Sequence, residues 1–391
     1  MTQRACFLSN KIITVQESDE IQDAIEEAEN KVVRILPNQY IVEVDCKNNP
    51  ITVPDNCIIQ AYGAELIFRN SDAGGYWADK MVDINNKKVT ILGGNWWIDR
   101  AGSVDDDARR LFKLSNGAFT TFIGSTISNN TGREGIAAGG AGTRAVCIGC
   151  LFQPQQNTYT DNVFIMLEQG ASCDVPGSTF DGFAVGTTTL RCEGGIQLYS
   201  HNSIESLVRG ATFKHLYQGV VITLYHAWGA DQGSVRICDC DFVDMLSSYL
   251  YPCIMLGTRT GTASPTYKLS SLIVESSRFS FKNGQNNGIF IGGYASYYNY
   301  TNPGSYPDAQ YNDQIKHLVL RNLTLLGGGV THGTLGTTGT PYIGILFNNY
   351  VNNLPTIAEV SDITVLGSFN EQDIVINSSI PVGKKSIIRE T

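Results

Sequence analysis

Hydrophobic positions along the chain follow one repeated pattern. An apolar residue is followed three positions later by a small residue and five positions later by an apolar or aromatic one, and this spacing recurs nine times. The starts of the nearest pair, Phe122 and Cys147, are 25 residues apart, and those of the most distant pair, Val274 and Leu320, are 46 apart. Spacing this variable excludes a rigid propeller or leucine-rich repeat and favours a solenoid with loops of different length. The nine repeats start at Ile91, Phe122, Cys147, Val175, Val208, Ile237, Val274, Leu320 and Val360.

Each repeat also contains a second short apolar segment, which often begins with Gly. Two or three short strands in a unit of about 30 residues are what one coil of a parallel β-solenoid needs. Equivalent positions would then stack about 4.8 Å apart from coil to coil. The pattern therefore predicts an all-β solenoid. The second segments include Gly135-Ile136, Val163–Ile165, Gly195–Leu198, Gly219–Ile222, Ile254-Met255, Gly288–Ile291, Gly344–Phe347 and Ile374–Ile376.

The N-terminal region supplies a family resemblance. Glu17 to Glu29 has the apolar stripe of an amphipathic helix, for which Ser18 is the expected N-cap. An "LP-x-x-Y" segment ending at Tyr40 and a "GA-x-L-I" segment at 63–67 follow, with Gln39 where a Gly is usual. This order resembles the opening of the pectate lyase and polygalacturonase superfamily, including its phage tailspike branch. The resemblance implies a single-stranded right-handed parallel β-helix over residues 32–391, with residues 1–31 as an N-terminal segment and capping helix.

The resemblance does not extend to known catalytic motifs. Polygalacturonases present Asn-Thr-Asp, Asp-Asp, Gly-His-Gly and Arg-Ile-Lys on successive coils, and none of these is complete here. The run 105–107 of three Asp residues could offer oxygen ligands to Ca²⁺, although such charge runs are usually solvated turns. This fold carries lyases, hydrolases, isomerases and inert fibres, so activity has to be argued from a site.

Composition and charge narrow the partners. The 28 Lys and Arg residues are outnumbered by 37 Asp and Glu, giving a net charge of −9, which argues against nucleic-acid binding. No apolar run has the length of a membrane span, so we expect no membrane insertion. The first fifteen residues also lack the apolar core of a secretory leader, so assembly inside a cell is one expectation.

Three carboxylates are predicted to form a column. Glu134 lies two residues before Ile136, Asp161 two before Val163, and Glu193 three before Ile196, so all three would occupy nearly the same place in neighbouring coils. Carboxylates about 5 Å apart suit a retaining glycosidase, and those about 6.5–9.5 Å apart suit an inverting one. We therefore predict Glu134, Asp161 and Glu193 as catalytic acid, base or nucleophile. The alternative is that they are solvated surface charges.

Residues that could bind sugar surround this column or lie in aromatic segments. The predicted substrate-binding residues are Arg133, Arg191, Tyr225, His226, Trp228, Tyr297 and Tyr298. Aromatic rings among Asn, Ser and Gly are typical of binding loops, but the Tyr-rich segment at 292–313 could equally pack against another subunit.

The histidines and cysteines do not predict a metal site. The five histidines show no ligand spacing. Cys150 and Cys240 occupy the small-residue position of their repeats, so they are expected to be reduced interior side chains rather than zinc ligands. We expect no cofactor.

Three functions stay open on the sequence alone. The first is a tailspike-like homotrimer on a virion surface, with other virion proteins as further partners, that binds a host polysaccharide and could cleave it. The second is a free, secreted polysaccharide lyase or glycoside hydrolase. The third is a structural fibre or capsid-decoration protein without activity.

Overall fold

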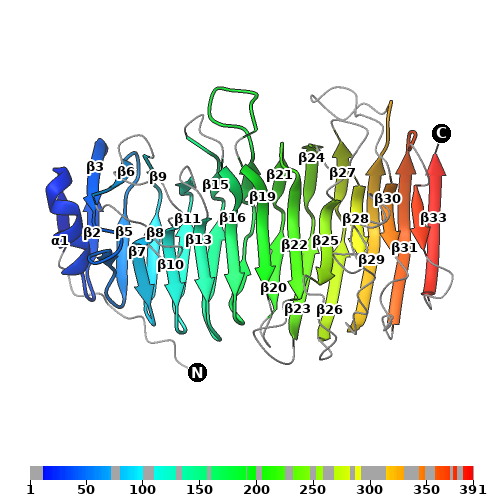
Figure 1. Ribbon diagram of the computed structural model, residues 1–391, viewed down its shortest axis with the longest axis horizontal. Helices are drawn as coiled ribbons and strands as arrows, with labels where there is room; N and C mark the ends of the chain where they lie inside the picture. Colours follow the sequence, from blue (N-terminus) through cyan, green and yellow to red (C-terminus); the bar gives the residue numbers. More distant parts are fainter. Residues whose placement is uncertain are drawn as a thin grey trace.

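A computed structural model gives the architecture. It describes residues 12–71, 80–99, 110–128, 134–155, 160–190, 192–199, 205–224, 232–246, 252–258, 268–281, 287–291, 314–329, 343–347, 357–369, 373–376 and 382–390. Within these ranges the chain forms 33 strands, one α-helix and one 3₁₀ helix. The strands stack as successive coils along the long axis, from α1 at one end to β33 at the other (Figure 1).

Three parallel rows of strands build the solenoid. Most coils take one strand from each row, but in the last coils one long strand runs through the first two rows. A 22-stranded sheet contains the first two rows, and an 11-stranded sheet forms the third. The first row is β1 (Ile12–Val15), β2 (Val32–Ile35), β5 (Cys57–Gln60), β8 (Lys88–Leu92), β11 (Phe119–Ile123), β14 (Arg144–Ile148), β17 (Ser172–Asp174), β20 (Ser206–Arg209), β23 (Gln232–Cys238), β26 (Lys268–Glu275), β29 (Gln314–Leu326), β31 (Ile357–Leu366) and β33 (Val382–Glu390).

The second row is β3 (Gln39–Val44), β6 (Glu65–Asn70), β9 (Asn95–Ile98), β12 (Thr126–Ile127), β15 (Leu151–Phe152), β18 (Thr179–Asp181), β21 (Thr212–Lys214), β24 (Asp241–Met245) and β27 (Arg278–Phe281). The third row is β4 (Ile51–Thr52), β7 (Lys80–Asn85), β10 (Arg110–Ser115), β13 (Glu134–Gly139), β16 (Thr160–Glu168), β19 (Cys192–Tyr199), β22 (Gln218–Leu224), β25 (Pro252–Thr258), β28 (Asn287–Ile291), β30 (Ile343–Phe347) and β32 (Ile374–Ile376). The predicted strands are therefore present.

A left-handed residue makes the corner in all nine predicted repeats. It stands two positions after the apolar start, where the chain turns from the first row toward the second. Gly adopts positive φ without steric cost, and Asn and Asp tolerate it better than most residues. The corner residues are Gly93, Gly124, Gly149, Gly177, Gly210, Asp239, Ser276, Asn322 and Asp362.

The residue that follows the corner is buried in eight of the nine repeats, as predicted, and Gly94 in the first repeat is half-buried. Ser178 is 1% exposed; its hydroxyl donates to the Cys147 carbonyl at 2.7 Å and accepts from the Cys150 N–H at 3.2 Å. Cys150 and Cys240 are 2% and 1% exposed, and burial raises the pKa of the Cys240 thiol to about 12. Small hydrogen-bonding side chains thus satisfy the backbone of the corner while fitting inside the coil. The nine cysteines within the described residues form no disulfide.

The fifth position of the repeat forms an interior row of aromatic rings. Phe152, Phe180, Phe213, Phe242 and Phe279 stack with centroids 4.5, 4.7, 4.9 and 4.6 Å apart and interplanar angles of 10° or less. These distances match the spacing between parallel strands, so the rings follow the coil repeat.

Several third-row strands have a Gly near their start because the row of rings leaves no room for a side chain there. A Cβ on Gly195 would lie 2.7 Å from the Phe213 ring, and one on Gly219 would lie 2.4 Å from the Phe242 ring. The backbone of the 11-stranded sheet therefore approaches the rings too closely for a side chain.

The N-terminal helix is shorter than expected. A 3₁₀ turn at Ser18–Glu20 leads into α1 (Ile21–Glu26), and Ile21, Ala24 and Ile25 are buried. The Ser18 N-cap was wrong, because the Ser18 hydroxyl instead accepts the Ile41 N–H of β3 at 3.1 Å. That α1 closes the end of the solenoid, and that the domain boundary falls at residue 32, stay predictions.

Candidate functional site

A cluster of charged side chains lies on the outward side of the 11-stranded sheet. In β10, Phe112 and Leu114 belong to the hydrophobic core, so Lys113 between them faces outward. Arg110 reaches the same side, since its guanidinium and the Lys113 ammonium both approach the Glu168 carboxylate. Neighbouring strands pair in register with β10 and add charged residues to this face. We call the set the charged face; its members are Lys80, Asp83, Arg110, Lys113, Glu134 and Glu168.

Arg110 connects two carboxylates from different coils. Its Nε lies 2.9 Å from Glu134 Oε2, and its Nη2 lies 3.8 Å from Glu168 Oε1. Lys113 Nζ is also 3.8 Å from Glu168, at Oε2. One guanidinium thus holds together residues that are 24 and 58 positions away in the sequence.

The charged face is recessed despite lying outside the core. The Glu134 side chain is 1% exposed, that of Arg110 11%, and that of Glu168 18%. Burial, followed by the nearby charge of Arg110, lowers the pKa of the Lys113 ammonium. Three cations offset three carboxylates, but desolvating such groups costs several kcal/mol per ion, so a buried ion pair is weak evidence of a purely stabilising role.

Only one of the two carboxylate oxygens of Asp83, on the charged face, has a partner among the described residues. Its Oδ2 pairs with Lys80 Nζ at 2.9 Å. Its Oδ1 is buried and has no hydrogen-bond partner in the part of the chain that the structure describes. Buried acceptors without a donor are uncommon, so this oxygen can accept a donor from water or a ligand.

The predicted carboxylate column has a different register from the one expected. Ile136 pairs with Ile165, which in turn pairs with Ile196, so Glu134 stands level with Val163 rather than with Asp161. The alternative that Glu134 is a solvated surface charge is wrong as well, since its side chain is buried against Arg110.

Asp161 and Glu193 lie on neighbouring strands at an irregularity. Thr160 pairs with Cys192 and Val163 with Gly194, so two residues of β16 stand opposite the single residue Glu193. The extra residue is a β-bulge, a feature that is over-represented beside active sites. For Asp161 and Glu193 the structure describes the strand and not the side chain. The other predicted residues, Arg133, Arg191, Tyr225, His226, Trp228, Tyr297 and Tyr298, lie outside the described residues, as does the Asp run at 105–107.

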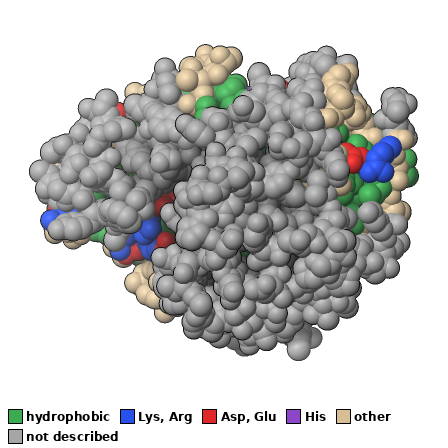
Figure 2. Space-filling model, turned by 45° about the vertical axis from the view of Figure 1, so that its right-hand side comes forward, with side chains coloured by type: hydrophobic (Ala, Val, Ile, Leu, Met, Phe, Trp, Pro, Cys, Tyr) green, Lys and Arg blue, Asp and Glu red, His purple; other side chains and the backbone are tan. Residues whose placement is uncertain are grey.

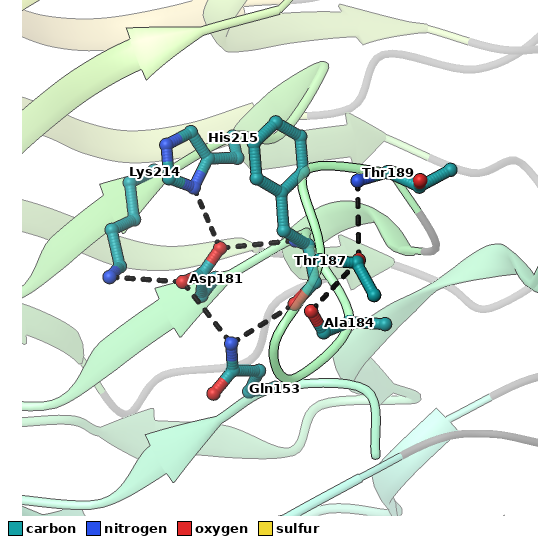
Figure 3. Close-up of polar contacts among 8 residues, drawn as sticks. Gln153, Asp181, Ala184, Thr187, Thr189, Lys214 and His215 are labelled. Carbon is teal, nitrogen blue, oxygen red and sulfur yellow. Dashed lines mark hydrogen bonds and ion pairs between the residues drawn. The ribbon is translucent and has the colours of Figure 1, made fainter. Parts of the chain in front are cut away.

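A second polar cluster anchors the segment that leads to Glu193 (Figure 3). Asp181, at the end of β18, accepts hydrogen bonds at Oδ1 from His215 Nδ1 at 2.8 Å and from the Phe183 N–H at 3.0 Å. At Oδ2 it pairs with Lys214 Nζ at 2.9 Å and accepts from Gln153 Nε2 at 3.4 Å. Burial would raise the pKa of Asp181, but the hydrogen bonds from His215, Lys214 and Phe183 outweigh it and hold this pKa below its usual value.

This Asp181 cluster fixes the base of the loop 182–190. The Phe183 ring stacks on the His215 ring at 4.0 Å, and the Cys192 N–H donates to the Gly182 carbonyl at 3.2 Å, so the loop leaves and returns at one place. Its tip is exposed, with Val185 at 49%. The loop thus protrudes directly before Glu193.

Several of these residues carry little signal in the sequence. Arg110, Lys113 and Glu168 were missed because no local motif contains them, although Arg110 and Lys113 are spaced to fit the outward positions of one strand. His215 shows no ligand spacing in the sequence, but it stands one position beyond Lys214, which pairs in register with Asp181.

The wider surface shows mixed charge. On the face in Figure 2, visible Lys and Arg side chains lie next to Asp and Glu side chains. Across the described ranges there is no group of three metal-ligating side chains and no helix long and apolar enough to span a membrane.

Comparisons with known proteins agree on the fold. No protein-family model and no curated protein sequence matches this chain. Two solved structures of the catalytic domain of a GH87 α-1,3-glucanase in complex with nigerose are similar, with TM-scores of 0.56 and 0.55 and sequence identities of 11% and 12%. Each match covers 97% of this chain and 68% of the other. An exopolygalacturonase of family 28 from Yersinia enterocolitica matches at a TM-score of 0.49 and 13% identity, over 97% of this chain and 78% of that one.

The chain therefore has a right-handed parallel β-helix fold, which it shares with these glucanase domains. This confirms the fold expected from the repeat and from the N-terminal resemblance.

Proposed function

We propose that this chain binds and hydrolyses a polysaccharide on the outward side of its 11-stranded sheet. The observation that carries the proposal is the bulge at which Asp161 and Glu193 lie on adjacent strands, next to the recessed charged face. Solved structures of this fold with TM-scores above 0.5 are α-1,3-glucanase catalytic domains in complex with a disaccharide, which supports the substrate class.

Asp161 and Glu193 form the proposed catalytic pair. Neighbouring parallel strands are about 4.8 Å apart, which is close to the separation of about 5–5.5 Å between the carboxyl groups of retaining glycosidases. One carboxyl group would protonate the leaving oxygen and the other would attack the anomeric carbon. Repulsion between two carboxylates raises one pKa, as the acid requires.

The charged face has the proposed role of holding the sugar chain. Glu168, fixed by Arg110 and Lys113, is the most accessible of the carboxylates bound to Arg110. Asp83 holds Lys80 at the edge of this face, with Oδ2 2.9 Å from Nζ. Glu134 is too deeply buried to contact substrate, so its proposed role changes from catalysis to positioning Arg110.

The biological setting is proposed to be a virion surface, with a tailspike-like homotrimer as the assembly. Exposed apolar side chains on the outward side of the 22-stranded sheet support contacts between subunits; Tyr62 is 58% exposed, Phe119 42% and Ile148 40%. Light scattering at micromolar concentration tests the assembly, and a monomer mass would contradict it.

The catalytic pair is tested by Asp161→Asn and Glu193→Gln. Loss of an acid or base in catalysis lowers turnover by about 10²–10⁴. The assay measures reducing ends released from a panel of neutral and acidic polysaccharides, and absorbance of unsaturated products, which would indicate a lyase. Glu168→Gln is expected to raise KM more than it lowers kcat.

The matched control is Glu275→Gln. Glu275 is 15% exposed and paired with Arg321, much like Glu168, but it lies on the other sheet. Its turnover should equal that of the wild type. Wild-type rates in both Asp161→Asn and Glu193→Gln would refute the pair, and a wild-type protein that shortens no polysaccharide would refute hydrolysis itself.

A further inference from the structure

A polar group around a tryptophan lies on the outward side of the second row of strands, away from the charged face. In β9, Trp96 and Ile98 belong to the core, whereas Asn95 and Trp97 do not and are half-buried. Asn95 is in register with Glu65 of β6, which is in register with Gln39 of β3. We call Gln39, Glu65, Asn95, Trp97 and Gln155 the indole site.

Glu65 organises the indole site. Its Oε1 accepts hydrogen bonds from Trp97 Nε1 at 3.0 Å and from Asn95 Nδ2 at 3.3 Å, and its Oε2 accepts from Gln39 Nε2 at 2.7 Å. The bond to Nε1 fixes the orientation of the indole ring. A ring held in one orientation loses little entropy when a ligand stacks on it.

The carboxylate of Glu65 is held differently from two other outward carboxylates of the 22-stranded sheet. Glu275 pairs with Arg321, and Asp174 pairs with Arg209. Among the described residues Glu65 has no ion-pair partner and is held by neutral donors. Its charge is therefore not cancelled by a neighbouring cation, and hydrogen bonds from hydroxyl groups to an ionised acceptor are stronger than neutral ones.

Asn95 contributes a hydrogen-bond acceptor to the indole site. Its Nδ2 faces two acceptors, Glu65 Oε1 and Gln155 Oε1 at 3.3 Å each, and this settles the orientation of the amide. Its Oδ1 is then buried without a hydrogen-bond partner among the described residues. Leaving a buried acceptor unsatisfied costs about 1–3 kcal/mol, so a donor is expected there.

We propose that the indole site is a second carbohydrate-binding site, separate from the catalytic face, which takes a neutral sugar unit of the polysaccharide. The C–H face of a pyranose ring packs on the indole, and a hydroxyl donates to Asn95 Oδ1. The ligand class rests on the proposed function, but binding here does not require cleavage.

A neutral unit is favoured over an acidic one because Glu65 would repel a uronate carboxylate. The exposed neighbour Ile41, at 38%, extends the apolar surface beside this row without adding charge.

Trp97→Ala is the test. Binding of nigerotetraose, maltotetraose, cellotetraose and tetragalacturonate is measured by calorimetry in the Glu193→Gln background, so that substrate is not consumed. We expect Trp97→Ala to weaken binding of a neutral tetrasaccharide about tenfold, with Trp97→Phe in between. Quenching of tryptophan fluorescence by that sugar should be smaller in Trp97→Phe, and hydrolysis of short substrates should not change in the Glu193 wild-type background.

Phe119→Ala is the matched control, because Phe119 is an exposed ring on the same sheet without a polar frame. Unchanged sugar affinity in Trp97→Ala would overturn the proposal, and so would absence of neutral sugar binding to the unmodified indole site. A loss of oligomer mass in Trp97→Ala without a change in sugar affinity would identify a subunit interface instead. Cleavage by the wild-type protein is scored separately, so the two proposals can fail independently.

Discussion

The interior row of rings and the outward side of the 11-stranded sheet differ in how much the residue type varies from coil to coil. Inside, five consecutive coils place Phe at the same position, and the rings stack at 4.5–4.9 Å. Outside, the column through the middle of the third row changes character at nearly every coil: Asp83, Lys113, Ala137, Met166, Gln197, Val221 and Met255.

The difference shows which positions the fold constrains. Stacking gains contact area when identical rings repeat, so the interior restricts the sequence strongly. The outward column can vary without loss of the fold. It is charged in β7 and β10, and the bulge lies further along the same sheet, where β16 pairs with β19. Departures from a local rule are expected at functional sites, which is why we place the proposed function there.

Phe213→Ala should give the largest effect and tests the interior side of the comparison. Phe213 is fully buried between Phe180 and Phe242, and Phe→Ala substitutions in cores cost about 3–5 kcal/mol. The free energy of unfolding is measured in urea. Phe119→Ala, at an exposed position, should stay within about 0.5 kcal/mol of wild type. Equal losses of unfolding free energy in the two variants would mean that a stacked interior ring contributes no more stability than an exposed one.

Arg110→Met tests the outward side. It leaves the Glu134 carboxylate buried without the guanidinium at 2.9 Å, and breaking a buried pair in this way costs about 3–5 kcal/mol. Adding Glu134→Leu removes the unpaired buried charge and should restore most of the stability, because replacing a buried ion pair with apolar side chains often leaves the stability unchanged. A double variant as unstable as the single one would show that the pair is part of the packing that the fold requires.

The features that the sequence predicted are those that repeat within one coil. Corner, small residue and ring fall within five residues, so Cys150 and Cys240 could be placed inside from spacing alone. The corner residue itself was overlooked, although Gly, Asn and Asp at that position are the usual signal.

The candidate site could not be predicted to the same degree because it depends on register between coils. Aligning the second strands on Val163 instead of Ile165 put Asp161 level with Glu134, and no local pattern reveals the bulge. The contact between Arg110 and Glu168 spans 58 residues and two turns of the solenoid, so it follows from stacking rather than from a motif. Ser18 failed as a cap for the same reason, since its partner Ile41 is a neighbour only in space.

Asp181→Asn should give the smallest effect and sharpens the comparison at the loop 182–190. Hydrogen bonds to a charged group contribute about 1.5–3 kcal/mol, and the amide keeps one acceptor, so a loss of about 1–2 kcal/mol is expected at pH 7. The pKa of Asp181 is depressed in the folded protein, while an unfolded Asp titrates near about 3.9. Its stabilisation is therefore complete above about pH 4 and is lost as the pH falls through the folded pKa. The difference in Tm between wild type and Asp181→Asn should accordingly shrink from pH 4 downward.

Asp241→Asn, which removes an exposed carboxylate paired with Arg278, should show almost no difference at any pH. A gap between wild type and Asp181→Asn that stays constant down to pH 2 would show that the Asp181 charge does not hold the base of the loop.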